Sequence, residues 1–179
     1  MKNILFILLF FGLVTQAQDK YLTKIGSVNF EASVPSFEEV AAKNNSVTAI
    51  INIATNEFAA LVLVKGFRFK NALMEEHFNE NYAESNLYPK ATFKGIVIGN
   101  KLKDNISGNY NIDGDLTFHG ITKPIKDISV KITFNNNTIT LEGTFSINAS
   151  DFEIKIPNIV KNKVSETVNV NFTFNLVQS

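Results

Sequence analysis

Few side chains of this sequence have the types and spacing that catalysis or metal binding requires. The two histidines are His77 and His119, and Glu75-Glu76-His77 lacks the second histidine of a helical zinc-protease motif. A metal pair of His77 and His119 would need the fold to bring the two rings together. Because the chain has no cysteine, thiolate metal sites, disulfides and a cysteine nucleophile are excluded.

The other polar candidates are two carboxylates and a tyrosine. Asp113 and Asp115 share one face of an expected strand and could do acid–base work, but outward, solvated charges are the simpler interpretation. Tyr110 has the parity of Ile112 and is the best inward polar group for an enzyme that used a barrel interior as its reaction chamber. No nucleophile elbow, P-loop or dinucleotide glycine pattern occurs. We therefore predict no catalytic residues and no metal site.

Length and charge place the chain among small single-domain proteins without affinity for nucleic acid. It has 179 residues, and 17 basic side chains balance 17 acidic ones. Residues 1–17 combine a positive start, the apolar run Ile4 to Val14 and the small residues Thr15-Gln16-Ala17. This order is typical of a signal peptide, so we expect export, cleavage after Ala17 and a mature domain over residues 18–179.

Period-two alternation of apolar and polar residues dominates the rest of the chain and predicts β-strands with one buried face. In residues 167–177, Val168, Val170, Phe172, Phe174 and Leu176 alternate with polar residues. Asn135-Asn136-Asn137 predicts a tight hairpin. The predicted strands cover about 21–34, 46–55, 58–69, 91–99, 112–118, 128–134, 138–147, 152–156 and 167–177.

One segment departs from alternation. Met74, Phe78 and Tyr82 fall on one helical face, which predicts a short amphipathic helix over about 71–83 that lies across the end or side of the sheet. Eight or so one-sided strands favour an all-β, eight-stranded antiparallel barrel over a sandwich, since closure removes exposed edges. A small outer-membrane barrel has the same period, and the internal helix argues against it.

Three stretches together resemble the YceI family of exported lipid-binding proteins. The first is Met74 to Phe78 followed by Tyr88 to Gly95. The second is Gly114 to Pro124, which reads GDLTFHGITKP and is the most specific. The third is Ile147 to Phe152, which leads into the last alternating strand.

The resemblance implies an extended lipocalin-like barrel in the periplasm, with a hydrophobic tunnel for polyisoprenoid chains that include isoprenoid quinones. Two positions depart from the family pattern. Glu153 stands where the family often has glycine, and Gly26-Ser27 lacks the histidine of the family's first strand. A role of that histidine at the tunnel mouth is therefore in doubt here.

Together these observations predict a binding protein and not an enzyme, with a barrel enzyme acting on a lipid precursor as the alternative. A long-chain isoprenoid lipid would be its ligand, with no cofactor, no nucleic-acid partner and no integral membrane span after signal cleavage, and with a homodimer left open. Apolar burial would hold the lipid tail with little directional chemistry. Thr117 and His119 are expected to organise a turn. The candidate tunnel-lining residues are Phe30, Phe93, Leu116, Phe118, Phe134, Phe145, Phe172 and Phe174.

Overall fold

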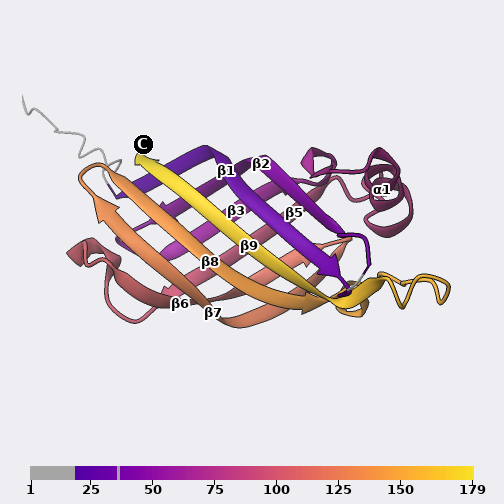
Figure 1. Ribbon diagram of the computed structural model, residues 1–179. Coiled ribbons are helices and arrows are strands. Elements are labelled where there is room, and N and C mark those ends of the chain that lie inside the picture. The colour runs from indigo at the N-terminus through magenta and orange to yellow at the C-terminus, as the bar shows by residue number, and fades with distance from the viewer. Residues whose placement is uncertain (1–18, 36) are drawn as a thin grey trace, which may run out of the picture.

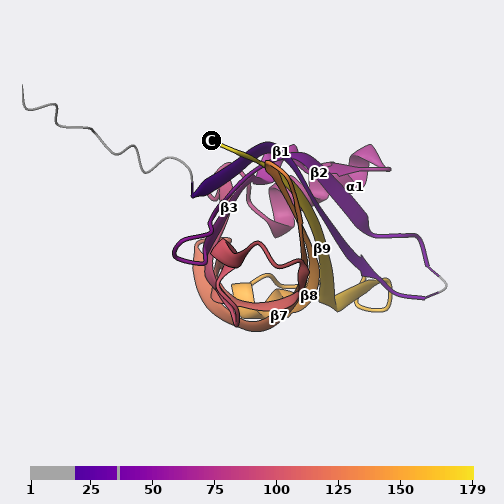
Figure 2. The same ribbon diagram turned by 90° about the vertical axis from the view of Figure 1, so that its left-hand side faces the viewer.

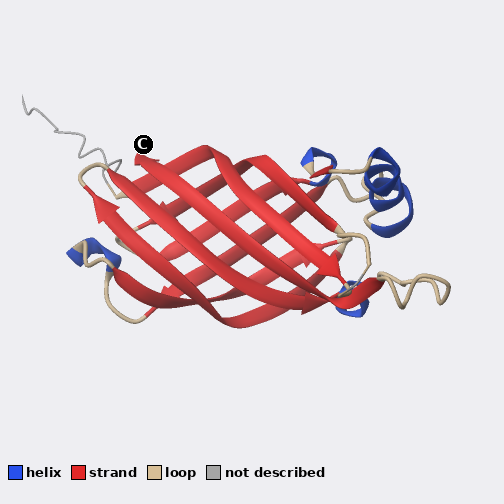
Figure 3. Ribbon diagram, viewed as in Figure 1, coloured by secondary structure: helices blue, strands red, loops and turns tan. Residues whose placement is uncertain are grey.

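The computed structural model describes residues 19–35 and 37–179 and consists mostly of antiparallel strands (Figures 1 and 3). The predicted signal peptide, with its cleavage after Ala17, lies outside the described residues and stays a prediction. Within the described ranges, no helix is both long and apolar enough to cross a bilayer. The strands are β1 (Lys20–Ser33), β2 (Ala41–Asn52), β3 (Glu57–Leu63), β4 (Arg68–Phe69), β5 (Lys90–Ile98), β6 (Gly108–Phe118), β7 (Ile121–Asn135), β8 (Thr138–Asn148) and β9 (Val164–Gln178).

Eight long strands close into a barrel, which confirms the predicted fold class. Along the sheet the order is β1-β9-β8-β7-β6-β5-β3-β2, and β1 pairs with β2 to complete the ring. The two-residue strand β4 pairs with β2 beside this ring. Among the described residues, each of the eight strands pairs with a neighbour on both sides over at least part of its length, which protects most of the strand edges.

The apolar residues of the alternating pattern face the inside of the barrel, and the polar residues face the outside. In β9, Val170, Phe172, Phe174 and Leu176 are buried, and the asparagines and threonines between them are exposed. The predicted hairpin is also present, since β7 ends at Asn135, β8 begins at Thr138 and Asn136 has φ 48°. Asparagine tolerates this left-handed conformation better than most residues.

The strand predicted over 58–69 stops earlier than expected. β3 ends at Leu63, and a 3₁₀ turn, η1 (Val64–Gly66), separates it from β4. Asn44, a buried residue of β2, donates a hydrogen bond of 3.0 Å from Nδ2 to the Leu63 carbonyl. A Cβ at Gly66 would lie 2.5 Å from the same Asn44 amide, so the turn needs glycine here. β2 begins at Ala41, five residues before the predicted start at residue 46. The prediction started too late because the buried Asn44 interrupts the apolar pattern.

The strand predicted over 152–156 is wrong. Residues Ala149–Phe152 form a 3₁₀ turn, η4, and Glu153 follows with φ 57° and ψ 21°. This left-handed residue turns the chain into a long connection that reaches β9 at Val164. Ile154 and Ile156 keep an apolar environment there, which is why their spacing imitates a strand.

The predicted helix is present as α1 (Ala72–His77) continued by a π-helical turn, η2 (Phe78–Tyr82). The Asn71 side chain caps it by accepting a 2.9 Å hydrogen bond from the Leu73 N–H. In Figure 1 the helix and the long connection after η4 both lie at the right-hand end of the barrel.

The opposite end of the barrel is packed shut. Figure 2 looks along the barrel from this end and shows the segment between β5 and β6 lying across the ring. That segment contains the 3₁₀ turn η3 (Leu102–Asp104), in which Leu102 is completely buried. The same core cluster contains further fully buried side chains, namely Ile51, Ile132, Ile139, Leu141 and Leu176. Apolar side chains therefore occupy this half of the barrel.

Candidate functional site: an apolar cavity open at one end

A cavity of about 390 Å³ occupies the half of the barrel nearest α1. Its deep end is formed by Phe58, Phe174, Ile112 and Ile128, beyond which the packed core begins. Towards the other end the lining passes to residues of α1, of the β1–β2 connection and of the connection after η4. Several of these are exposed, so the cavity opens to solvent at this end, which we call the mouth. A volume of this size lies within the usual range for ligand pockets, about 300–1,000 Å³.

Glycines in the barrel wall let aromatic rings lie flat along the inside of the cavity. Gly95 and Gly114 pair across β5 and β6, and a Cβ on either would come within 2.8 Å or 2.6 Å of the Phe93 ring. A Cβ at Gly143 would likewise meet the Phe172 ring at 2.7 Å. These glycines mark close approaches of ring to backbone, and they keep the rings from filling the bore.

Four phenylalanines from different segments form a cluster at the mouth. Phe78 of the helix lies 5.2 Å from Phe30 of β1, 5.8 Å from Phe67 and 5.3 Å from Phe69, measured between ring centroids. Phe30 also contacts Phe67 edge-on at 5.0 Å. Because such pairs add to the free energy of apolar burial, the cluster holds the helix against the barrel rim.

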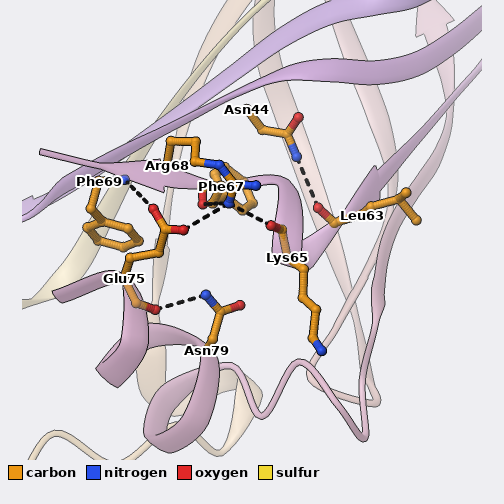
Figure 4. A network of polar contacts seen from close by, with 8 residues as sticks. All are labelled: Asn44, Leu63, Lys65, Phe67, Arg68, Phe69, Glu75 and Asn79. Carbon is orange, nitrogen blue, oxygen red and sulfur yellow. Dashed lines mark hydrogen bonds and ion pairs between the residues drawn. The ribbon is translucent and has the colours of Figure 1, made fainter. Parts of the chain in front are cut away.

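A polar network fixes the same helix from its other side (Figure 4). The Glu75 carboxylate accepts hydrogen bonds from Arg68 Nη1 at 2.9 Å and from the Phe69 N–H at 3.1 Å. The Arg68 Nη1 also donates to the carbonyls of Lys65 and Phe67. Asn79 Nδ2 donates to the Glu75 carbonyl at 2.8 Å, within the helix. The helix is therefore tied to β4 by a charge-assisted contact between Arg68 and Glu75, neither of which lines the cavity.

His119 joins three segments at the mouth. His119 and Gly120 form the tight turn between β6 and β7, with φ of 49° and 76°. The ring places Nδ1 2.9 Å from the Phe152 carbonyl and Nε2 2.7 Å from Glu84 Oε2. A carbonyl oxygen can only accept, so the Nδ1–H donates to the Phe152 carbonyl. With the Thr117–Thr122 hydroxyl contact of 2.7 Å, this agrees with the expected role of His119 and Thr117 in the turn.

Charged side chains enter the lining at the mouth. Glu38, His77 and Lys163 are all exposed and come from three separate segments. The walls between the mouth and the deep end are almost wholly aliphatic and aromatic. The cavity can thus take a long apolar group, and a polar group at the end of that ligand would remain in water.

Seven of the eight predicted lining residues line this cavity. They are Phe30, Phe93, Leu116, Phe118, Phe145, Phe172 and Phe174, and their contact with a ligand stays a prediction. Phe134 is not among the lining residues. It packs partly buried against the core near the β7–β8 hairpin, at the closed end. Parity along a strand predicts the face of a residue but not its depth in the barrel.

Sequence reasoning missed a second group of lining residues outside the alternating strands. Phe67 belongs to no strand, and Ile154, Ile156 and Val160 belong to the irregular connection after η4. The helix face was a usable signal, since Met74, Phe78 and Tyr82 all line the cavity.

The polar candidates for chemistry lie elsewhere. Tyr110 is buried outside the cavity lining, and its hydroxyl donates a 2.6 Å hydrogen bond to the Ile106 carbonyl. Asp113 Oδ1 accepts the Asp127 N–H at 2.8 Å, which stabilises an irregular point in the β6–β7 pairing. Within the described ranges, no three histidine or acidic side chains are grouped closely enough to hold a metal ion.

Several curated bacterial proteins are similar to this chain in sequence. A UPF0312 protein of Pseudomonas syringae pv. tomato is 28% identical over 165 residues, which cover 86% of this chain and 69% of that protein. The UPF0312 protein VPA0850 of Vibrio parahaemolyticus is 26% identical over 141 residues, with 73% and 72% of the two chains covered.

Solved structures share the fold at low identity. A polyisoprenoid binding domain from Saccharophagus degradans superposes with a TM-score of 0.77 at 16% identity, covering 90% of this chain and 99% of that domain. BcnA of Burkholderia cenocepacia gives a TM-score of 0.71 at 19% identity, with 86% and 96% covered. The family model described as the YceI-like domain matches residues 21–176, which is almost the whole barrel. The protein therefore belongs to the family of YceI-like domains.

Proposed function

We propose that this protein binds a long-chain isoprenoid lipid, with the apolar tail in the cavity and the polar end at the mouth. The observation that carries the proposal is an apolar cavity that opens to solvent at one end. Three polar side chains of its lining, Glu38, His77 and Lys163, are exposed at that opening. The choice of an isoprenoid is supported by the polyisoprenoid binding domain of Saccharophagus degradans, which has the same fold. The seven lining residues named above are proposed to contact the tail.

Burial alone is a sufficient source of affinity. Each buried methylene contributes about 0.8 kcal/mol, so one five-carbon isoprene unit contributes about 4 kcal/mol before the costs of association. A few units within the cavity therefore reach useful affinity without directional polar contacts. This fits a lining that offers such contacts at the mouth and few along the walls.

Binding without chemistry explains the site better than catalysis on a lipid precursor. The enzyme alternative depended on Tyr110 as an inward reactive group. The Tyr110 hydroxyl is instead engaged by the Ile106 carbonyl, away from the cavity lining.

We further propose a periplasmic address and a role in carrying or storing the lipid. The predicted signal peptide over residues 1–17 supports export. Expression of the full chain in a Gram-negative host, followed by fractionation and N-terminal sequencing, should give a periplasmic protein that begins at Gln18. A cytoplasmic product that still begins at Met1 would contradict this part of the proposal.

Lipid identity can be tested directly on the purified protein. Native mass spectrometry should find a co-purifying isoprenoid, and organic extraction should remove it. Reloading the extracted protein with an isoprenoid quinone should raise its melting temperature, because a ligand that binds the folded state alone stabilises it. A straight-chain fatty acid serves as the comparison ligand. Retention of straight-chain lipids in preference to isoprenoids, or of no lipid at all, would overturn the proposal.

A further inference from the structure

We propose that the mouth of the cavity docks on the surface of an anionic lipid bilayer, with Ile159 inserted among the lipids. This inference rests on the proposed lipid binding and adds the membrane as the surface from which the lipid is taken up. Four exposed apolar side chains lie at this end of the barrel, each on a different segment. They are Phe37 (46% exposed), Leu73 (56%), Leu87 (70%) and Ile159 (84%).

The connection over residues 154–164 carries the most direct signal. Ile154, Ile156 and Val160 turn inward and line the cavity. Ile159 turns outward and is the most exposed large apolar residue in the described part of the chain. In Figure 1 this connection extends beyond the barrel at the mouth end. An isoleucine at such a projecting point has no packing role in the folded monomer.

The charges around Ile159 favour an anionic surface. Lys155, Lys161 and Lys163 lie in the same connection, and residues 154–164 contain no acidic side chain. In the described part of the chain none of these lysines forms a short ion pair, and Lys161 interacts electrostatically with Glu166 just beyond the connection. Elsewhere at the mouth, Glu75 and Glu39 pair with Arg68 and Lys70, and Glu38 is an exposed carboxylate.

An apolar tip flanked by lysines fits the interface of a bilayer, where apolar groups enter the acyl region and ammonium groups stay with anionic headgroups. Docking in this orientation also removes the main barrier to uptake. A lipid tail that passes directly from the bilayer into the mouth never exposes its apolar surface to water. Ile159, the lysines around it and the mouth of the cavity would therefore face the bilayer together.

Co-sedimentation with vesicles tests the inference. The lipid-loaded protein should bind vesicles of phosphatidylethanolamine and phosphatidylglycerol, and bind phosphatidylcholine vesicles more weakly. Ile159→Asp should reduce the binding to anionic vesicles at least tenfold. The double variant K155Q/K161Q should reduce it about fivefold per lysine at low salt, and added salt should shrink that difference.

A matched control separates the mouth from the barrel wall. Ile96 of β5 is 52% exposed on the outer wall, and Ile96→Asp should leave vesicle binding unchanged. Equal losses in I159D and I96D, or no loss in I159D, would overturn the proposed orientation. A concentration-dependent dimer that I159D abolishes, without any vesicle binding, would show that a second copy covers the mouth instead.

The same experiment distinguishes this inference from the function on which it rests. I159D should keep its bound lipid and its melting temperature, since Ile159 does not line the cavity. Loss of vesicle binding with lipid retained supports docking. Wild-type protein that retains lipid but ignores both kinds of vesicle refutes docking and leaves lipid binding intact. Wild-type protein that binds vesicles but never retains lipid refutes the proposed function.

Discussion

Replacing Ala60 with phenylalanine should block the cavity and weaken lipid binding without harming the fold. Ala60 is a small lining residue of β3, between Phe58 and Val62 on the inward face. It pairs with Phe93 of β5, so a ring at this position would enter the middle of the bore. The cavity offers room for the ring there, and we expect A60F to melt at the wild-type temperature or above.

The size of the effect follows from the carbons that the new ring displaces. Phenylalanine adds about six carbon atoms beyond alanine, close to one isoprene unit, whose burial is worth about 4 kcal/mol before offsets. Part of the displaced tail stays covered nearer the mouth. We therefore expect a loss of about 1.4–2.7 kcal/mol, which is a ten- to hundredfold rise in Kd.

Competition against a fluorescent prenyl probe measures this rise, and the absence of tryptophan in the chain keeps the background low. Ala59→Phe is the matched control, because Ala59 lies on the same strand but outside the cavity lining. A60F should also affect long chains more than a prenyl chain too short to reach Ala60. Wild-type affinity in A60F, or an equal loss in A59F, would refute the assignment of this cavity as the lipid site.

Three further substitutions test the construction of the site. Gly114→Ala should destabilise the fold by about 1–3 kcal/mol, since its Cβ would lie 2.4 Å from a backbone oxygen, whereas Gly108→Ala on the same strand should be nearly neutral; urea unfolding compares them. Glu153→Gly should raise the melting temperature by about 1–2 °C by relieving the left-handed residue, and a fall would refute this account of residue 153. Hydrogen bonds from the Ser150 side chain and N–H lower the pKa of Glu166. Its ionised form therefore stabilises the fold above the unfolded pKa of about 4.3, and the deficit of Glu166→Gln in thermal melts should vanish as the pH falls through the lowered folded value; a pH-independent deficit would contradict it.

The barrel could be predicted from the sequence because apolar and polar residues alternate along the long strands, which identifies the buried face of each strand. Val170, Phe172 and Phe174 alternate with polar residues without interruption, and one residue of slip would expose them all. The resemblance to the YceI family added the ligand class, which alternation cannot provide. The helix was predictable for the same reason, because Met74 and Phe78 are four residues apart and so fall on one face of a helix with 3.6 residues per turn.

Depth and irregular backbone could not be predicted in this way. Phe134 has the inward parity of a lining residue, but the pairing register places it at the closed end. The spacing of Ile154 and Ile156 imitates a strand, and the turn that prevents one depends on the left-handed conformation of Glu153. Such conformations are favourable for glycine, so a glutamate at this position gives no signal by itself, and the glycine that the family often has here was the usable one.

The most direct test of this account is a crystal structure of the extracted protein reloaded with an isoprenoid quinone. The account predicts one extended chain of density that enters beside Phe78 and ends against Phe58 and Phe174, with the quinone ring near Lys163 at the mouth. Density on the outer wall, or an interior closed by the side chains of the cavity itself while the ligand lies elsewhere, would contradict it.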